Sequence, residues 1–215
     1  IADFEKEKNR KVTRFEILTS MAILYYKENN CDICILETGL GGLYDCTNIV
    51  DSIISVFGSI SFDHVSILGN SLSEIAVQKA GIIKPNSDTV IFDQNSDVID
   101  VMKSTCITKN STLHLLKQND ISNYSVNGTN QIFDFKHYNN IEINLIGLKQ
   151  IENTSVVLEC FEILKSKYNF NISNSAIKNS LKSIKHPARF EQLSKTPNII
   201  FDGAHNENAM KNLVN

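Results

Sequence analysis

Continuous apolar runs that end in polar or glycine-rich residues are the feature that most constrains the fold of this chain. Two of them span residues 31–36 and 53–60, and a shorter one spans 89–92. Such runs are typical of parallel strands buried on both faces of a sheet. Residues 15–29 and 71–80 carry apolar side chains at helical spacing. The alternation predicts an α/β fold with a mostly parallel sheet flanked by helices, whose strands meet at one carboxyl edge.

The pattern changes between residues 112 and 146, where short segments alternate apolar and polar residues. Asn127 and Gly128 form a hairpin-turn signal within this region. We therefore expect a small antiparallel addition to the parallel sheet. Further helices are predicted at 98–104, 151–168 and 173–183.

Pro187 marks the predicted domain boundary, because the residue before a proline is pushed out of helical geometry. Residues 1–187 form the first predicted domain, and residues 188–215 begin a second one. Within the second, a short strand is predicted at 199–201, followed by a turn and a helix that starts at Glu207.

Composition excludes several classes of function. The 215 residues are 42% hydrophobic and 21% charged, which is typical of a globular protein with a buried core. A net charge of -3 offers no basic surface of the kind that a general nucleic-acid binder needs. No apolar run approaches the roughly 18 residues of a membrane span, and no signal-peptide pattern opens the chain. We therefore expect a cytoplasmic protein without nucleic-acid or membrane partners.

The five cysteines are odd in number and scattered, so we expect reduced thiols rather than a disulfide framework. Cys31 and Cys34 have the spacing of a redox motif, but residues three apart on a strand point to opposite faces. A redox or metal role is therefore disfavoured. The chain starts at Ile1 within a charged stretch and stops within a predicted helix, so we expect an internal fragment of a longer protein.

Three polar residues near the ends of the first apolar runs are candidates for a shared site. Glu37 ends the first run, where a carboxylate needs a cation such as magnesium, or else a helix cap or an ion pair. His64 follows the second run and suits a metal, a phosphate oxygen or a structural hydrogen bond. Lys79 lies in a predicted helix with a buried stem, which favours a reactive amine, although a lysine with its head in water is the alternative.

Two glycine-containing segments add weaker signals. Gly39-Leu-Gly-Gly42 lets the backbone approach a ligand closely, but the same pattern occurs in ordinary turns. Asp202-Gly-Ala-His-Asn206 places a carboxylate after a strand and before a helix start, where backbone N–H groups attract anions. It is equally compatible with a turn and a helix cap. Arg189 is a candidate phosphate clamp or a surface residue.

Taken together, these segments resemble the folylpolyglutamate synthase and dihydrofolate synthase family of the Mur ligase superfamily. The resemblance spans essentially the whole chain and rests on seven motifs in order. They are Thr13-Arg-Phe-Glu16, Leu36-Glu-Thr-Gly-Leu-Gly-Gly42 continuing to Asp45-Cys-Thr-Asn-Ile-Val50, Phe62-Asp-His64 with Leu68-Gly69, Lys79-Ala-Gly-Ile-Ile-Lys-Pro85, Gln150 with Asn153, Pro187-Ala-Arg-Phe-Glu191, and Asp202-Gly-Ala-His-Asn206.

The resemblance implies a central, ATP-binding ligase domain of the P-loop type over residues 1–187 and the beginning of a Rossmann-like domain over 188–215. It also implies ATP-dependent amide formation, in which a folate or dihydropteroate carboxylate is activated as an acyl phosphate and attacked by the amine of L-glutamate. Metal ions and basic groups must neutralise these anions. The implied small-molecule partners are ATP, L-glutamate and the pterin substrate, and a monomer is expected.

Individual roles are carried over from the family motifs. By resemblance, Glu37 and His64 bind Mg²⁺, and Lys79 is carbamylated by carbon dioxide and supports a second metal, so Lys79 and His64 are the catalytic candidates. Asn153, Arg189 and Asp202 are implied to contact ATP. His205 and Asn206 complete the last motif in a supporting role. The pterin pocket is implied to involve Thr13, Arg14, Phe15, Glu16, Tyr44, Asp45 and Cys46.

Several positions depart from the family pattern. Leu43 and Lys149 stand where arginine and histidine are common, and His186-Pro187-Ala188 replaces a frequent Trp-Pro-Gly. No G-x-x-G-K-[ST] phosphate loop occurs in the 215 residues, so the chain by itself is expected to be inactive. A non-catalytic remnant and a peptidoglycan-precursor ligase are the alternatives, and the 45–50 and 79–85 motifs favour the folate branch.

Overall fold

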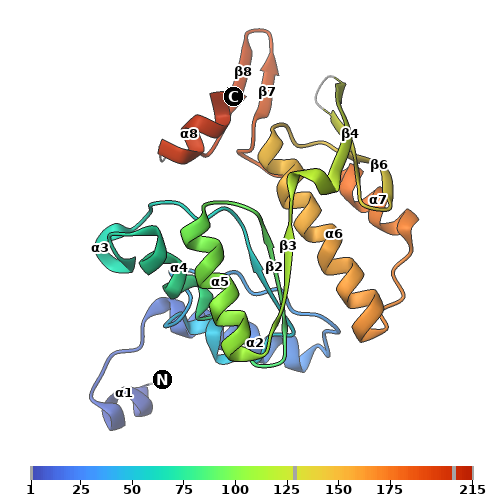
Figure 1. Ribbon diagram of the computed structural model, residues 1–215. Helices are drawn as coiled ribbons and strands as arrows, with labels where there is room; N and C mark the ends of the chain where they lie inside the picture. The colour runs from blue at the N-terminus through green and yellow to red at the C-terminus, as the bar shows by residue number, and fades with distance from the viewer. Residues whose placement is uncertain (1, 128–129, 205–206, 215) are drawn as a thin grey trace.

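A three-stranded parallel sheet forms the centre of the first part of the chain (Figure 1). The computed structural model describes residues 2–127, 130–204 and 207–214. The strands are β1 (Ile54–Phe57), β2 (Asp88–Phe92) and β3 (Thr112–Leu116), in the order β1-β2-β3. Val56 pairs with Val90, which in turn pairs with His114. The middle strand β2 is buried over its whole length, as its continuous apolar pattern predicts.

Helices occupy both faces of this sheet, as the sequence predicts (Figure 1). The helical segments are α1 (Ala2–Lys8), α2 (Arg14–Glu28), η1 (Cys46–Ile49), α3 (Val65–Leu68), α4 (Leu72–Ala80), α5 (Ser96–Lys109), η2 (Gln118–Asp120), α6 (Leu148–Tyr168), α7 (Asn174–Ser183) and α8 (Glu207–Val214). Within the described ranges, none of them combines the length and apolarity that crossing a bilayer requires.

Alternate side chains of β2 enter two separate apolar cores. Ile91 packs with Ile75 of α4 and Met102 of α5 on one face of the sheet. Val90 and Phe92 point to the other face and pack with α6, α7 and the antiparallel strands. This division follows from the period of two along a strand. Full burial of each large apolar side chain contributes roughly 1.5–3 kcal/mol. Because β2 supplies such side chains to both cores, it stabilises the packing of helices on both faces of the sheet.

The antiparallel strands form a sheet of their own, which differs from the expected addition to the parallel sheet. They are β4 (Ile121–Asn127), β5 (Asn130–Phe135) and β6 (Tyr138–Ile143), in that order. Asn127 pairs with Asn130, so the predicted hairpin is present, while Gly128 lies outside the described residues. Phe133, Phe135 and Tyr138 are fully buried in the core that this sheet shares with α6 and α7.

Residues 112–116 were assigned to the antiparallel region by their alternating pattern, and this expectation is wrong. They form β3, the third parallel strand, paired with β2 from Asp88↔Thr112 to Phe92↔Leu116. Because β3 lies at the edge of the sheet, it is only partly covered, and Leu116 is its one fully buried residue. A partly covered strand alternates in polarity whether its neighbour is parallel or antiparallel.

Residues 31–36 are not a buried strand, which is a second correction. They adopt no regular secondary structure, and the side chain of Ile35 is 87% exposed. A strand exists only when its N–H and C=O groups bond to a neighbour, and none of the described strands pairs with this segment. Glu37 therefore follows an exposed, extended segment. Cys31 and Cys34 within it are free and exposed thiols.

The last part of the chain is a two-stranded antiparallel hairpin followed by a helix. The hairpin consists of β7 (Glu191–Lys195) and β8 (Asn198–Phe201), and it stands apart from the parallel sheet with α8, at the top of Figure 1. The predicted strand at 199–201 and the helix from Glu207 are confirmed, whereas β7 was not predicted because its residues are mostly polar. The domain boundary at Pro187 stays a prediction.

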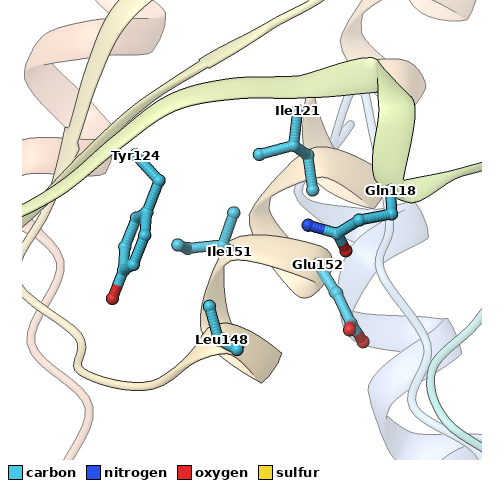
Figure 2. Close-up of a pocket in the computed structure, with 6 residues that line it drawn as sticks. All are labelled: Gln118, Ile121, Tyr124, Leu148, Ile151 and Glu152. Atoms are coloured by element: carbon cyan, nitrogen blue, oxygen red, sulfur yellow. The ribbon is translucent and has the colours of Figure 1, made fainter.

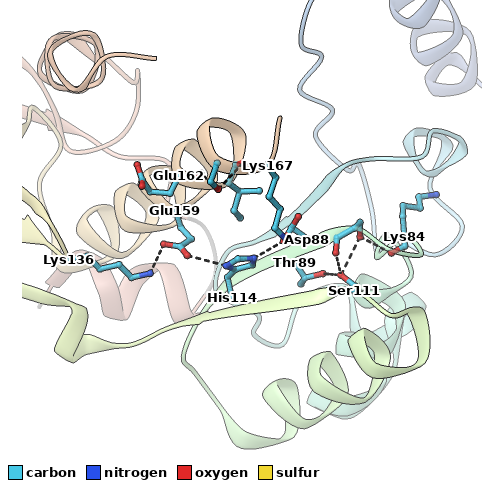
Figure 3. Close-up of polar contacts among 12 residues, drawn as sticks. Lys84, Asp88, Thr89, Ser111, His114, Lys136, Glu159, Glu162 and Lys167 are labelled. Atoms are coloured by element: carbon cyan, nitrogen blue, oxygen red, sulfur yellow. Dashed lines mark hydrogen bonds and ion pairs between the residues drawn. The ribbon is translucent and has the colours of Figure 1, made fainter. Parts of the chain in front are cut away.

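A partly buried network of charged side chains joins the parallel sheet to α6 (Figure 3). His114 of β3 contacts Asp88 of β2 through Nε2, at 2.7 Å, and Glu159 of α6 through Nδ1, at 3.2 Å. Lys167 and Lys136 bond to Asp88 and Glu159 at 2.5 and 2.6 Å. Each carboxylate thus faces both the imidazole and a lysine. The network lies away from the carboxyl end of β2, since Asp88 is the first residue of that strand.

Candidate functional site

A hollow of about 130 Å³ lies at the carboxyl end of β1. Its wall consists of Thr38, Gly41, residues 56–60, Lys79 and Ile82. The position agrees with the general rule that ligands of open α/β sheets bind beyond the carboxyl ends of the strands. Of the three polar candidates, Lys79 lines the hollow, and Thr38, the residue that follows Glu37, lies in the same wall.

Lys79 reaches the hollow from the last turn of α4. The helix begins with a capping box, in which Ser71 and Glu74 bond to each other's backbone N–H groups, and it ends at Ala80. Lys79 is half-buried. The sequence placed it in the middle of a helix, whereas the structure places it beside the terminal carbonyl groups, where a cation is favoured. The side chain is therefore anchored by the helix end and directed to the hollow.

The glycine segment 39–42 packs directly against this end of α4. The N–H of Leu43 donates to the carbonyl of Gln78 at 2.7 Å. A Cβ atom at Gly42 would lie 2.8 Å from the carbonyl oxygens of Gln78 and Lys79. Only glycine permits such a close backbone approach. The glycine signal in the sequence therefore has a packing explanation beside the hollow.

Asp45 organises the loop that continues from the glycine segment. Its carboxylate accepts hydrogen bonds from the N–H groups of Gly39 and Leu40, and from both the N–H and the hydroxyl of Thr47. Burial acts to raise the pKa of Asp45, but the bonds from Thr47, Leu40 and Gly39 outweigh it and hold the pKa below its ordinary value of 3.8. Asp45 thus stays ionised and acts as the hub of this loop.

Four of the seven predicted pterin residues come together at this loop. The ring of Phe15 lies so close to Gly39 that an added Cβ there would be 2.8 Å from Cζ. Glu16 lies close enough to Cys46 for its charge to contribute, after burial, to a raised pKa of the Cys46 thiol. Asp45 completes the group. The structure therefore brings these four residues together, at the start of α2 and in the 39–46 loop, and their assignment to a pterin substrate stays a prediction.

Thr13 and Glu16 also have a structural task at the start of α2. They form a capping box, with the Thr13 hydroxyl accepting from Glu16 N–H and the Glu16 carboxylate accepting from Thr13 N–H at 2.8 Å. The hydrogen bond from Arg10, followed by those from Thr13, lowers the pKa of Glu16 to about 2. Arg14 and Tyr44, the remaining predicted pterin residues, are exposed.

Substitution of Asp45 by alanine is expected to lower the free energy of unfolding by about 2 kcal/mol, because several N–H and O–H donors lose a charged acceptor. Urea unfolding followed by circular dichroism would measure the change. The exposed Asp51, changed to alanine, is the matched control and is expected to shift stability by less than about 0.5 kcal/mol. Equal stability of the two variants would contradict the role assigned to Asp45.

Glu37 and His64 lie on exposed segments on either side of β1 in the sequence. His64 adopts a left-handed backbone conformation, with φ of 48°, at the start of α3, and its Nε2 lies 3.7 Å from an Asp63 oxygen. Within the described residues, no three side chains of His, Cys, Asp or Glu are grouped as a metal site. The assignment of Glu37 and His64 as Mg²⁺ ligands stays a prediction.

The structure brings the segments of Arg189 and Asp202 together. One Asp202 oxygen accepts from Phe190 N–H and the other from Ala204 N–H, each at 2.8 Å. Arg189 itself is exposed, and so is Asn153 on α6. Their contact with ATP stays a prediction. His205 and Asn206, predicted to support this motif, lie outside the described residues.

Several residues of the site were not singled out by their sequence. Thr38 and Ser59 line the hollow, Thr38 because it follows Glu37 and Ser59 because it lies two residues beyond the end of β1. Asn48 and Lys84 connect the loop to the end of α4, through contacts described further below. The sequence offered one signal for the last two residues: Asn48 lies in the same motif as Asp45, and Lys84 lies in the same motif as Lys79.

A second, smaller hollow of about 50 Å³ lies at the start of α6 (Figure 2). Leu148 and Ile151 form its floor, and Tyr124 closes one side. The carboxylate of Glu152 is bonded to Lys149 at 2.6 Å. This space is mostly apolar and has room for only a few atoms, so we assign no ligand to it.

The fold and the first hollow define an α/β domain with its site at the carboxyl edge of a parallel sheet, a class that includes many nucleotide-dependent enzymes. The sequence profile of the Mur ligase middle domain matches residues 2–161. The chain belongs to this family.

Comparisons with individual proteins confirm the predicted resemblance. The chain is 34% identical, over 94% of its length, to a dihydrofolate synthase/folylpolyglutamate synthase of Bacillus subtilis (strain 168), and it covers 48% of that protein. It is 27% identical to the folylpolyglutamate synthase of Lacticaseibacillus casei, covering 98% of the chain and 50% of the relative. The chain therefore spans about half the length of the curated relatives it matches.

Solved structures agree with this result. A structure described as an FPGS-AMPPCP-folate complex superimposes with a TM-score of 0.91 at 27% identity, covering 99% of this chain and 53% of that one. The S73A mutant of L. casei FPGS gives a TM-score of 0.89 at the same identity, with 99% and 54% covered. The described fold is thus the fold of this part of those proteins.

Proposed function

We propose that the polypeptide to which this chain belongs is an ATP-dependent amide ligase that adds L-glutamate to folate, to dihydropteroate, or to both. The observation that carries the proposal is the hollow at the end of β1, where Lys79 and the glycine segment meet beside the Asp45 loop. Relatives named for this activity match nearly the whole chain, and one matching structure holds AMPPCP and folate.

The proposed reaction has two steps. A carboxylate of the pterin substrate attacks the γ-phosphorus of ATP, and an acyl phosphate and ADP form. The amine of L-glutamate then attacks the acyl carbon, the amide bond forms, a proton is lost and phosphate leaves. Because the reactants are anions, the protein contributes chiefly positioning and neutralisation of charge.

We assign the pterin substrate to the cluster at the start of α2 and the 39–46 loop. Phe15 supplies an aromatic face beside Gly39, and Asp45 holds the loop that carries Tyr44 and Cys46. The complete proposed set is Thr13, Arg14, Phe15, Glu16, Tyr44, Asp45 and Cys46. ATP is assigned to Asn153, Arg189 and Asp202, of which Arg189 supplies the positive charge.

The donor set of Glu37 and His64 fits a divalent cation. A carboxylate oxygen and an imidazole nitrogen are both metal ligands, and both side chains are open to water and phosphate oxygens that would complete the shell. Glu37 and His64 would hold Mg²⁺, which when bound neutralises the phosphates. Glu37 precedes Thr38 in the wall of the hollow, so the ion would belong to the same site as Lys79.

Lys79 is proposed to act as a carbamate. The ammonium first loses one proton to give the neutral amine. The amine nitrogen then attacks the carbon of carbon dioxide, an N–C bond forms as one C=O π bond opens to a carboxylate, and a second proton leaves the nitrogen, so that the cationic side chain becomes an anion. The proposal rests on the place of the side chain, which is half-buried and lines the hollow. The resulting carboxylate would face the hollow as a further oxygen donor.

The test is a ligase assay on the complete polypeptide with ATP, Mg²⁺, L-glutamate and either folate or dihydropteroate. We expect glutamylated product and an equal amount of phosphate, whereas the 215-residue chain alone is expected to show no turnover. Absence of product from the complete polypeptide with both pterin substrates would contradict the proposed function. A monomeric state and a cytoplasmic location are proposed alongside it, and sedimentation and cell fractionation would check them.

A further inference from the structure

Two parts of the proposed site come from distant stretches of sequence. The loop of residues 39–48 carries three of the proposed pterin residues, Tyr44, Asp45 and Cys46, and the last turn of α4 carries Lys79. The reaction that we propose needs the pterin carboxylate at a fixed distance from the groups that manage charge, because misplacement by about 1 Å can cost a hundredfold in rate. This distance depends on the contacts between the loop and the end of α4.

The side chain of Asn48 joins the two parts. Its Nδ2 donates to the carbonyl of Leu43 within the loop and to the carbonyl of Gly81 just after α4, each at 3.1 Å. The ammonium of Lys84 donates to the carbonyl of Asn48 at 2.7 Å. Two hydrogen bonds, one from the side chain of Asn48 to Gly81 and one from Lys84 to the backbone of Asn48, thus join the loop to the segment that directly follows Lys79.

The backbones of Leu43 and Gly81 lie in direct contact at this junction. A Cβ atom at Gly81 would lie 2.4 Å from the Cα of Leu43, which is less than any ordinary contact. The Cβ and Cδ1 atoms of Leu43 lie 2.5 and 2.8 Å from the same point, so both the backbone and the side chain of Leu43 pack against Gly81, and the hydrogen bonds of Asn48 act on segments already in contact. We expect the loss of those bonds to shift Gly81, which lies two residues after Lys79.

The Asn48 amide also carries a cost. Its Oδ1 is buried without a hydrogen-bond partner among the described residues. An unmatched buried acceptor costs about 1–3 kcal/mol, which offsets much of what its two donated bonds contribute. Rotating the amide would turn Oδ1 toward two carbonyl oxygens, so the observed orientation is the better one. Net stability is therefore a weak explanation for an asparagine at this position.

We propose that Asn48 is a positioning residue, which holds the pterin loop of residues 39–48 at the correct distance from Lys79. The proposal rests on the proposed ligase function. Asn48 acts through the backbone of Leu43 and Gly81 and needs no contact with the substrates. Lys84 supports it from the opposite side by fixing the Asn48 carbonyl.

The test compares three variants of the complete polypeptide with the wild type. Asn48→Ala removes both donated bonds, and Asn48→Asp keeps the shape of the side chain but cannot donate. Asn144→Ala is the matched control, because it removes a similar bond, from Asn144 Nδ2 to the Lys182 carbonyl, far from the hollow. The measured quantities are the midpoint of thermal unfolding, kcat, and the KM values for the pterin substrate and for ATP.

Both Asn48 variants are expected to raise the KM for the pterin substrate and to lower kcat, with about a tenfold to hundredfold loss in kcat/KM, while the KM for ATP changes little. Asn144→Ala is expected to leave all three kinetic values within about twofold. Near-normal kinetics of folded Asn48→Asp would overturn the proposal, since shape alone would then suffice. Kinetic values unchanged in folded Asn48→Ala would overturn it as well.

Hydrogen exchange gives a readout that does not need activity. The N–H of Leu43 bonds to Gln78 across the junction, so its exchange is expected to accelerate in Asn48→Ala and not in Asn144→Ala. Unchanged exchange would overturn the connection itself. A wild type without ligase activity would instead overturn the proposed function, whatever the exchange shows, so the two failures are distinguishable.

Discussion

Replacement of Lys79 by alanine is expected to reduce the ligase turnover of the complete polypeptide by at least about a hundredfold. The side chain lines the hollow at the end of β1, and its proposed carbamate supplies an oxygen donor there. Loss of one preorganised electrostatic group from an active site typically costs 10²–10³ in kcat. The assay measures phosphate release and product at saturating ATP and glutamate.

Lys79→Arg separates the carbamate from a plain positive charge. Arginine keeps a cation but does not form a carbamate, so we expect this variant to be as inactive as Lys79→Ala, and we expect added acetate to restore part of the activity of the alanine variant. Lys109→Ala, in the last turn of the neighbouring helix α5, is the matched control and should behave as wild type. Substantial activity of Lys79→Arg would refute the carbamate and favour a cationic role.

Replacement of His114 by alanine is expected to lower the free energy of unfolding by about 3 kcal/mol. His114 bridges Asp88, whose side chain is only 3% exposed, and Glu159, and its removal leaves two nearly buried carboxylates with one lysine each. Breaking a buried ion pair costs about 3–5 kcal/mol, and the remaining lysines place the value at the lower end. Urea unfolding would measure the change.

The effect of His114 depends on pH. The hydrogen bond with Glu159, and then the contact with Asp88, raise the pKa of His114 above 6.5, while the bond from His114 lowers the pKa of Glu159 below 4.5. A raised histidine pKa stabilises the fold fully below 6.5 and loses its effect as pH rises through the folded value. A lowered glutamate pKa contributes above 4.5 and is lost as pH falls.

The difference between wild type and His114→Ala is therefore expected to be largest between pH 4.5 and 6.5 and to shrink on either side. His137→Ala is a matched control, because His137 lies 3.6 Å from Glu162 but is mostly exposed, and such pairs contribute about 0–1 kcal/mol. A pH-independent loss in the His114 variant would show that its packing, rather than its charge, stabilises the fold.

The helices and the first two parallel strands were predictable because their signals are local. Periodicity located α2, α4 and α6, and the apolar runs located β1 and β2. The start of α2 depends on local residues too, since Thr13 and Glu16, the two partners of its capping box, lie within four residues of each other. Such features depend on neighbours in sequence and hardly on the remainder of the fold.

The structures of two segments were predicted wrongly, because strand formation depends on a neighbouring strand that the residues of the segment do not specify. Residues 31–36 have the apolarity of a buried strand, yet no described strand pairs with them, and they remain extended and exposed. Residues 112–116 alternate in polarity and nevertheless pair in parallel with β2. Burial and pairing are properties of what lies opposite a segment, which local patterns do not encode.

The candidate site likewise has features that the sequence predicted and features that only the structure revealed. The motifs identified Lys79, Asp45 and the family, because the sequence gives the type of each side chain directly. The contact of the glycine segment with the end of α4, the Asn48 bonds to carbonyls as far as 33 residues away, and the His114 network appeared only in three dimensions. Hydrogen bonds and ion pairs depend on distances of a few ångströms, which folding sets between segments that are remote along the chain.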